Sequence, residues 1–141
     1  MKKAVLTLVT ESDTIVFMDL DRAQESLRAA ELCLREGYAN SAASRAYYAM
    51  FQAAQVALEY VGFGRALWSH AGLQAAFATE CIHRRKIYPA ALREHLSIGL
   101  RTRQAADYGH AGVSQNIAHR LLRRAAVFVS AVEEVVLHGT P

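Results

Sequence analysis

Residues 40–61 read NSAASRAYYAMFQAAQVALEYV, and this stretch decides the fold. Small and apolar residues recur along it at helical spacing and share one side: Ala42, Ala46, Ala49, Met50, Ala53, Ala57 and Tyr60. A continuous polar stripe shares the other side: Ser41, Arg45, Tyr48, Gln52, Gln55 and Glu59. Because alanine side chains let neighbouring backbones approach closely, the stretch is predicted to be the central helix of a helical bundle.

Four further segments show helical periodicity, at about 19–36, 71–82, 89–108 and 114–136. Glycines follow several of them and Pro89 opens one, as is typical of helix ends and helix starts. We therefore predict an all-α fold, an antiparallel bundle of four long helices plus one short inserted helix. The bundle is expected over residues 18–138, and residues 1–17 are expected to form an N-terminal arm that is extended or disordered.

The composition fits a single soluble domain. Of the 141 residues, 52% are hydrophobic and 21% are charged, which favours a globular core over disorder. No apolar stretch reaches the roughly eighteen residues that a membrane span needs, and we expect no signal peptide. Cys33 and Cys81 stand far apart, which indicates neither a disulfide framework nor a zinc site. We expect a cytoplasmic protein whose net charge of +3 permits contact with nucleic acid without requiring it.

The apolar stripe of the fourth segment is interrupted near its end. The stripe consists of Leu92, Leu96 and Leu100. Its next position is Arg103, so a cation stands where another leucine would be expected, and Asp107 follows one turn later. Two interpretations remain open: an ion pair that serves packing specificity alone, or an arginine that binds a phosphate group.

Three blocks of sequence carry a resemblance to a known family. Residues 43–51, ASRAYYAMF, resemble the Ser/Asn-Arg-Ala-Tyr-Tyr-Ala-x-Phe signature of small bacterial and archaeal HEPN proteins. Residues 69–73, SHAGL, are similar to the family's His-Ser/Ala-Gly block. Residues 103–109, RQAADYG, are similar to its Arg-x-x-x-Asp-Tyr-Gly block. The resemblance covers about residues 20–137, which is nearly all of the expected domain.

The resemblance implies a helical bundle that dimerises, with a cleft at the dimer interface formed by Arg-x4-6-His motifs from both subunits. In the nuclease members of the family this motif cleaves RNA. Here it corresponds to Arg103 and His110, which have six residues between them. The better-studied toxin members have a shorter spacing and a tyrosine two places after the histidine, whereas Tyr108 precedes His110 in this chain.

RNA cleavage without a metal needs a base, an acid and a cation that stabilises charge at the reacting phosphorus. On this resemblance, the catalytic groups are Arg103 as the phosphate clamp and His110 as general base or acid, and we expect Asp107 to orient the arginine. The candidate RNA- or nucleotide-binding residues are Arg45, Tyr48 and Tyr108. The alternative for His110 is an exposed loop histidine, and for Arg45 and Tyr48 it is a solvated polar face.

Other residues receive structural assignments. We assign no metal and no cofactor, because His70, His83 and His95 do not stand at metal-ligand spacing. Tyr47 lies off the polar stripe and is predicted to belong to the core. His70 is expected to cap the short helix or to hydrogen-bond with it, and the alternative is that it binds a ligand.

Three functions remain open on the sequence. The first is a ribonuclease of toxin type, whose partner in related systems is a small nucleotidyltransferase that acts as antitoxin. The second is a non-catalytic dimer module that holds a nucleotide or a partner protein in the same cleft. The third is a purely structural dimer within a larger assembly.

Overall fold

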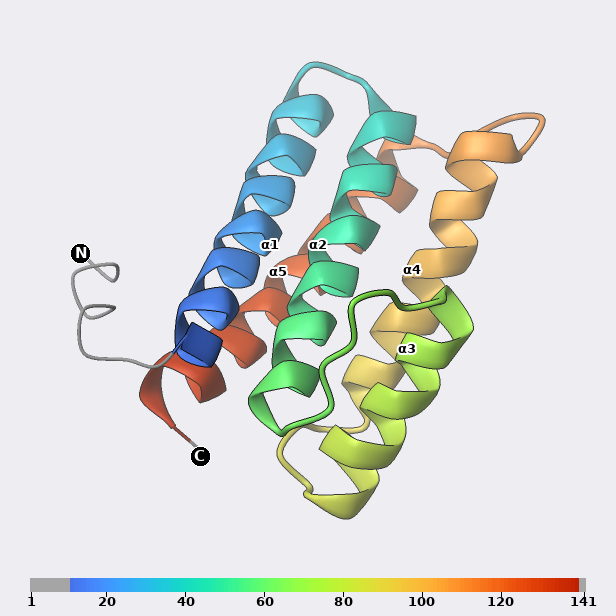
Figure 1. Ribbon diagram of the computed structural model, residues 1–141. Coiled ribbons are helices and arrows are strands. Elements are labelled where there is room, and N and C mark those ends of the chain that lie inside the picture. The colour runs from blue at the N-terminus through green and yellow to red at the C-terminus, as the bar shows by residue number, and fades with distance from the viewer. Residues whose placement is uncertain (1–10, 140–141) are drawn as a thin grey trace.

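The computed structural model describes residues 11–139, with side chains described from Leu20 onward, and this part of the chain is helical apart from its connecting loops. The elements are α1 (Glu11–Arg35), α2 (Ala39–Tyr60), α3 (His70–Ala76), η2 (Phe77–Arg84), α4 (Ala91–Tyr108) and α5 (Gln115–His138). Element η2 is a π-helix that continues α3. Figure 1 shows α1 and α4 running in one direction and α2 and α5 in the other. The predicted all-α bundle is confirmed.

The first helix starts earlier than expected. Helix α1 begins at Glu11, so the expectation of an extended or disordered arm is wrong for residues 11–17. The part of that expectation that concerns residues 1–10 lies outside the described residues. The β-branched residues Thr14, Ile15 and Val16 disfavour a helix only slightly, and the extension of an existing helix requires no new nucleus.

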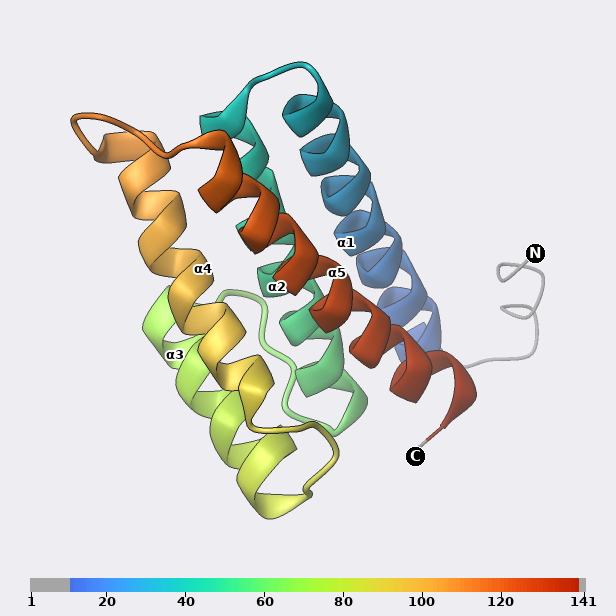
Figure 2. The same cartoon turned by 180° about the vertical axis from the view of Figure 1, so that it is seen from behind.

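Helix α2 packs against every other helical element of the described chain, in line with its alanine-rich face. Figures 1 and 2 show α1 alongside it and α5 across the opposite side of the bundle from α3. The buried residues of α2 are Ala42, Ala43, Ala46, Tyr47, Ala49, Met50, Ala53, Ala54, Val56, Ala57 and Leu58. Since most of these side chains are short, the neighbouring helices lie close to α2 and take their positions from it.

Helix α4 passes close to α2 at Gly99. A methyl group added at Gly99 would lie 2.6 Å from Cε of Met50 and 3.1 Å from Cδ1 of Tyr47, both on α2. Glycine in a helix interior normally costs about 1 kcal/mol relative to alanine. The close packing explains why glycine stands here, and it sets how near to α2 the next turn of α4, with Arg103, can lie.

Replacing Gly99 by valine should lower the free energy of unfolding by about 1–3 kcal/mol, because the new side chain overpacks the contact with Met50 and Tyr47. Urea unfolding followed by circular dichroism would measure the change. The matched control is Gln104→Val, which introduces valine at an exposed position of the same helix. Equal unfolding free energies for the two variants would contradict the packing argument.

Candidate functional site

The site begins with the charged pair at the end of α4. Nε of Arg103 donates a hydrogen bond to Oδ2 of Asp107 at 3.0 Å, across one helical turn. The Arg103 side chain is 15% exposed and that of Asp107 is 29% exposed, so the expected ion pair is present and partly buried. Among the described residues, no acceptor bonds the two terminal nitrogens of the Arg103 guanidinium. Those nitrogens are therefore available to a ligand.

Tyrosine rings from α2 and α4 lie beside this arginine. The central guanidinium carbon of Arg103 is 5.2 Å from the centre of the Tyr48 ring and 5.8 Å from that of Tyr108. The guanidinium of Arg45 is 5.3 Å from the same Tyr48 ring. All three distances are within the range of cation–π attraction. The structure thus brings five of the predicted site residues together as the arginine–tyrosine cluster: Arg45, Tyr48, Arg103, Asp107 and Tyr108.

The charges of the arginine–tyrosine cluster do not cancel. It holds two guanidinium groups and one carboxylate, and Arg45 makes no ion pair with a described residue. Arginine presents a planar set of N–H donors that matches phosphate oxygens, and tyrosine rings offer flat surfaces on which bases can stack. The cluster therefore has the chemistry of a site for a phosphate-bearing ligand.

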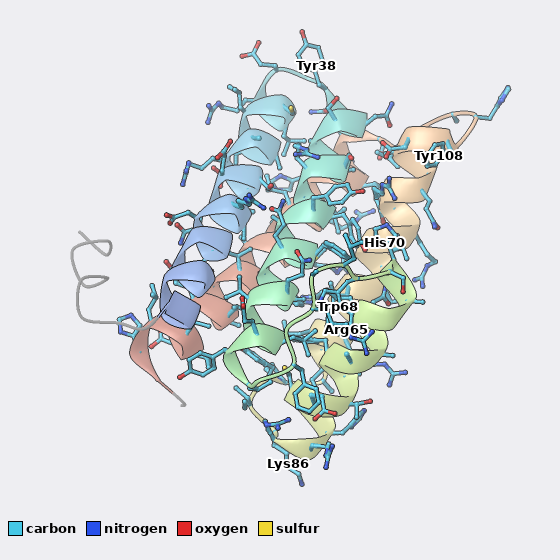
Figure 3. All side chains as sticks on the ribbon, viewed as in Figure 1. Tyr38, Arg65, Trp68, His70, Lys86 and Tyr108 are labelled. Carbon is cyan, nitrogen blue, oxygen red and sulfur yellow. The ribbon has the colours of Figure 1, made fainter. Side chains whose placement is uncertain are left out.

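Three further aromatic side chains, which the sequence did not assign to a site, adjoin the cluster: Tyr47, Phe51 and His70. The hydroxyl oxygen of Tyr47 lies 2.7 Å from Nδ1 of His70. The centre of the His70 ring lies 5.1 Å from that of Phe51, and Tyr47 contacts the ring of Tyr48 edge-on at 5.4 Å. Figure 3 shows His70 where α3 begins, facing α2 and α4. His70 and Phe51 therefore belong beside the arginine–tyrosine cluster.

The structural assignments of Tyr47 and His70 had different outcomes. Tyr47 is fully buried, as predicted. The expectation that His70 caps or hydrogen-bonds the short helix is wrong, because Ser69 accepts the capping bond from the backbone N–H of Gly72 at 3.0 Å. His70 bonds across to α2 instead. The Tyr47–Tyr48 doublet and the block around His70 were both visible in the sequence, but their spacing did not indicate that they meet.

The environment keeps both members of this hydrogen bond uncharged. Burial, followed by the positive charge of Arg103, lowers the pKa of His70 below its ordinary value of 6.5. Burial, followed by the neighbouring Tyr48, raises the pKa of Tyr47. At neutral pH the pair is therefore a neutral phenol beside a neutral imidazole.

His110 is not brought into contact with Arg103. It is exposed, just past the end of α4, and makes no hydrogen bond or ion pair with a described residue. Gly109 allows the chain to leave the helix here, because a side chain at this position would clash with the carbonyl oxygen of Ala105. The loop is held at its far end, where Oδ1 of Asn40 accepts a hydrogen bond from the N–H of Val113 at 2.8 Å. In a single chain, His110 faces solvent.

A separate groove of about 450 Å³ lies between α3–η2 and α4. His83 and Arg93 line it, but no member of the arginine–tyrosine cluster does. Its lining holds no tyrosine, phenylalanine or tryptophan ring, and its arginine, Arg93, makes no ion pair with a described residue. We therefore place the candidate site at the cluster, where charge, stacking surfaces and free donors coincide.

Comparison with known sequences gives the family. The sequence model of the HEPN domain matches residues 19–135. The chain is also similar to the UPF0332 protein glr0978 of Gloeobacter violaceus, with 31% identity over 117 residues that cover 82% of this chain and 90% of the relative. The protein belongs to the HEPN domain family.

Membership makes the chain a helical module of a nucleotide- and RNA-related family, whose domains commonly dimerise. No helix among the described residues is both long and apolar enough to span a membrane. Within the same part of the chain, no three His, Cys, Asp or Glu side chains lie close enough together to hold a metal ion.

The lowered pKa of His70 predicts how stability depends on pH. Since the folded state resists protonation of His70, the unfolded state binds more protons, and the free energy of unfolding should fall as the pH drops below about 6.5. The pKa of His95 is lowered too, by burial and by Arg124, and acts in the same direction. Urea unfolding of the wild type and of His70→Asn at several pH values would isolate the part due to His70. Parallel pH profiles for the two proteins would show that His70 contributes nothing.

Proposed function

We propose that the protein is a metal-independent RNA endonuclease that works as a cytoplasmic homodimer. The observation that carries the proposal is the partly buried Arg103, held through Nε by Asp107, with its terminal nitrogens free beside the rings of Tyr48 and Tyr108. The terminal nitrogens can contact phosphate oxygens while the tyrosine rings stack on the flanking bases. Arg45, whose guanidinium lies 5.3 Å from the centre of the same Tyr48 ring, adds a second cation for the next phosphate.

The reaction assigned to this site is an internal transfer at phosphorus. A base removes the proton of the ribose 2′-OH, and the oxygen attacks the adjacent phosphorus. The P–O5′ bond breaks, and an acid gives a proton to the leaving 5′-oxygen, so that the products are a 2′,3′-cyclic phosphate and a 5′-hydroxyl. Arg103 stabilises the charge on the phosphorane, and His110 supplies or removes a proton.

A dimer is part of this proposal because the fold of one chain does not bring His110 into contact with Arg103. Arg103 lies on the surface of α4 and His110 lies in the exposed loop beyond it. A twofold axis beside the end of α4 would bring the arginine of one subunit and the loop of the other to a shared cleft. A specific interface of this kind buries at least about 1,000 Å² in total.

The runner-up is a non-catalytic module that binds RNA or a nucleotide through the same residues. The observation that favours it is the separation just described: the cation and the stacking rings are assembled within a single chain, whereas His110 makes no contact with them. Binding without cleavage by the wild-type protein would establish this function instead.

Substituting Arg103 by lysine should reduce RNA cleavage by about 10²- to 10³-fold, because an ammonium group cannot reproduce the planar contact with phosphate. Replacing His110 by alanine should reduce it by roughly 10²- to 10⁴-fold. Cleavage of a labelled RNA by the purified dimer, in the presence of EDTA, would measure both. Arg120→Lys, at an exposed position of α5, is the matched control and should cleave normally.

Each variant must keep the helical signal, melting behaviour and dimer mass of the wild type before its rate is interpreted. Normal cleavage by folded Arg103→Ala and His110→Ala proteins would overturn the catalytic assignment.

We extend the proposal to regulation by a nucleotidyltransferase antitoxin. Tyr108 is 78% exposed and lies 5.8 Å from the Arg103 guanidinium, so it is accessible to a partner enzyme. Its hydroxyl would attack the α-phosphate of a nucleoside triphosphate, lose its proton and release pyrophosphate. The attached nucleotide would occupy the free donors of Arg103 and repel an RNA phosphate.

Co-expression with such a nucleotidyltransferase should add the mass of one nucleotide per chain, as measured on the intact protein. Tyr108→Phe should remain unmodified, while Tyr38→Phe, at another exposed tyrosine, should be modified like the wild type. Modification of the Tyr108→Phe protein would place the acceptor elsewhere.

A further inference from the structure

The histidine that meets the arginine–tyrosine cluster within one chain is His70. We infer that His70 is a phosphate-binding residue of this site, and that its Nε2–H donates to the same phosphate that Arg103 binds. The inference rests on the proposed function and adds to it a residue outside the Arg103–His110 motif. It assigns His70 a neutral, donating role, and Tyr47 the role of a positioning residue that selects the tautomer.

The tautomer follows from the burial of Tyr47. The Tyr47 side chain is fully buried, and the partner of its hydroxyl among the described residues is Nδ1 of His70, at 2.7 Å. If Nδ1 carried a proton and donated it to Tyr47, the hydroxyl proton of Tyr47 would be left without an acceptor, which is costly in a buried site. Tyr47 therefore donates, Nδ1 accepts, and the neutral ring carries its proton on Nε2.

The second ring nitrogen is open to a ligand. Nε2 of His70 has no partner among the described residues, and it is not one of the enclosed polar atoms that lack a hydrogen bond. His70 begins α3, which packs against both α2 and α4. The centre of the Tyr48 ring lies 5.2 Å from the central guanidinium carbon of Arg103 and 6.4 Å from the centre of the His70 ring. A ligand stacked on Tyr48 would therefore lie beside both Arg103 and His70, and His70 would offer it the unpartnered Nε2.

The groups that surround His70 favour a neutral donor. The rings of Tyr47, Tyr48 and Phe51, all on α2, lie beside the His70 ring. Burial, and after it the positive charge of Arg103 on α4, lowers the pKa of His70. None of these groups is a carboxylate that would hold a second positive charge on the ring. A neutral Nε2–H adds a directed donor for a phosphate oxygen without repelling the Arg103 guanidinium, whereas an imidazolium would repel it.

Side-chain NMR of the protein with ¹⁵N-labelled histidine tests the tautomer without any RNA. At pH 7 the His70 ring should carry its proton on Nε2, with Nδ1 unprotonated, and Tyr47→Phe should shift proton occupancy toward Nδ1. The His70→Asn protein identifies the signal by its loss. A wild-type ring protonated on Nδ1 would overturn the inference.

Binding tests the donor role, with a single-stranded uridine oligonucleotide and inorganic pyrophosphate as probes. Asparagine places an acceptor near the position of Nδ1 but no donor at Nε2, so His70→Asn should satisfy Tyr47 and still weaken binding of both probes by roughly 10- to 100-fold. Glutamine places an amide donor near the Nε2 position, so His70→Gln should recover part of the loss. His119→Asn, at an exposed position of α5, is the control.

The outcomes separate the inference from the proposed function. Wild-type affinity for pyrophosphate in a folded His70→Asn protein would overturn the inference and leave the proposed function standing. Binding of pyrophosphate, weakened by His70→Asn, in a protein that neither binds nor cleaves RNA would reject the RNA function alone. A wild-type protein that binds neither probe would overturn both.

Discussion

The packing of one buried side chain, Tyr47, holds the rest of the site in place. Its ring lies against Gly99 of α4, its hydroxyl bonds His70 at the start of α3, and its edge meets Tyr48 on its own helix. Tyr48 in turn lies beside Arg103. Three helices are thereby positioned by contacts to one residue, and core packing and site geometry depend on the same contacts. A tyrosine suits this position because its ring fills the core while its hydroxyl requires a specific partner.

The same arrangement explains how an arginine occupies a position that a leucine would take in an ordinary helix. A partly buried guanidinium is tolerated when its charge is compensated and its donors are satisfied. Asp107 satisfies Nε of Arg103, and the rings of Tyr48 and Tyr108 supply cation–π attraction. The compensation is incomplete, because the terminal nitrogens have no hydrogen-bond partner within the part of the chain that the structure describes. An ion pair built only for packing would bury or bond those nitrogens as well, so their freedom favours ligand binding over the purely structural interpretation.

The helices and the five residues of the arginine–tyrosine cluster could be predicted from the sequence, because both predictions depend on local spacing. The stripe that ends at Arg103 and the polar face that carries Tyr48 follow directly from helical periodicity, and the structure brings these residues together. The contact between Tyr47 and His70 could not be derived in this way, because it depends on how the loop between α2 and α3 turns. That η2 is a π-helix was also not predicted from the sequence, because the spacing of apolar residues over eight positions hardly distinguishes a π-helix from an α-helix.

The two histidines illustrate a limit of motif spacing. His110 was singled out because it follows Arg103 at a recognised interval, yet the structure leaves it exposed and without a hydrogen-bond or ion-pair partner among the side chains of residues 20–139. His70 stands far from Arg103 in the sequence, yet its ring lies beside that of Tyr48, which adjoins the arginine, and burial together with the Arg103 charge lowers its pKa. A neutral histidine fixed by a buried tyrosine is suited to binding, whereas His110 stands in an exposed loop beyond the end of α4. On the proposed function, the binding groups are assembled by the fold of one chain, whereas the proposed proton-transfer group, His110, would depend on assembly with a second chain, so binding and cleavage would be separable properties of this architecture.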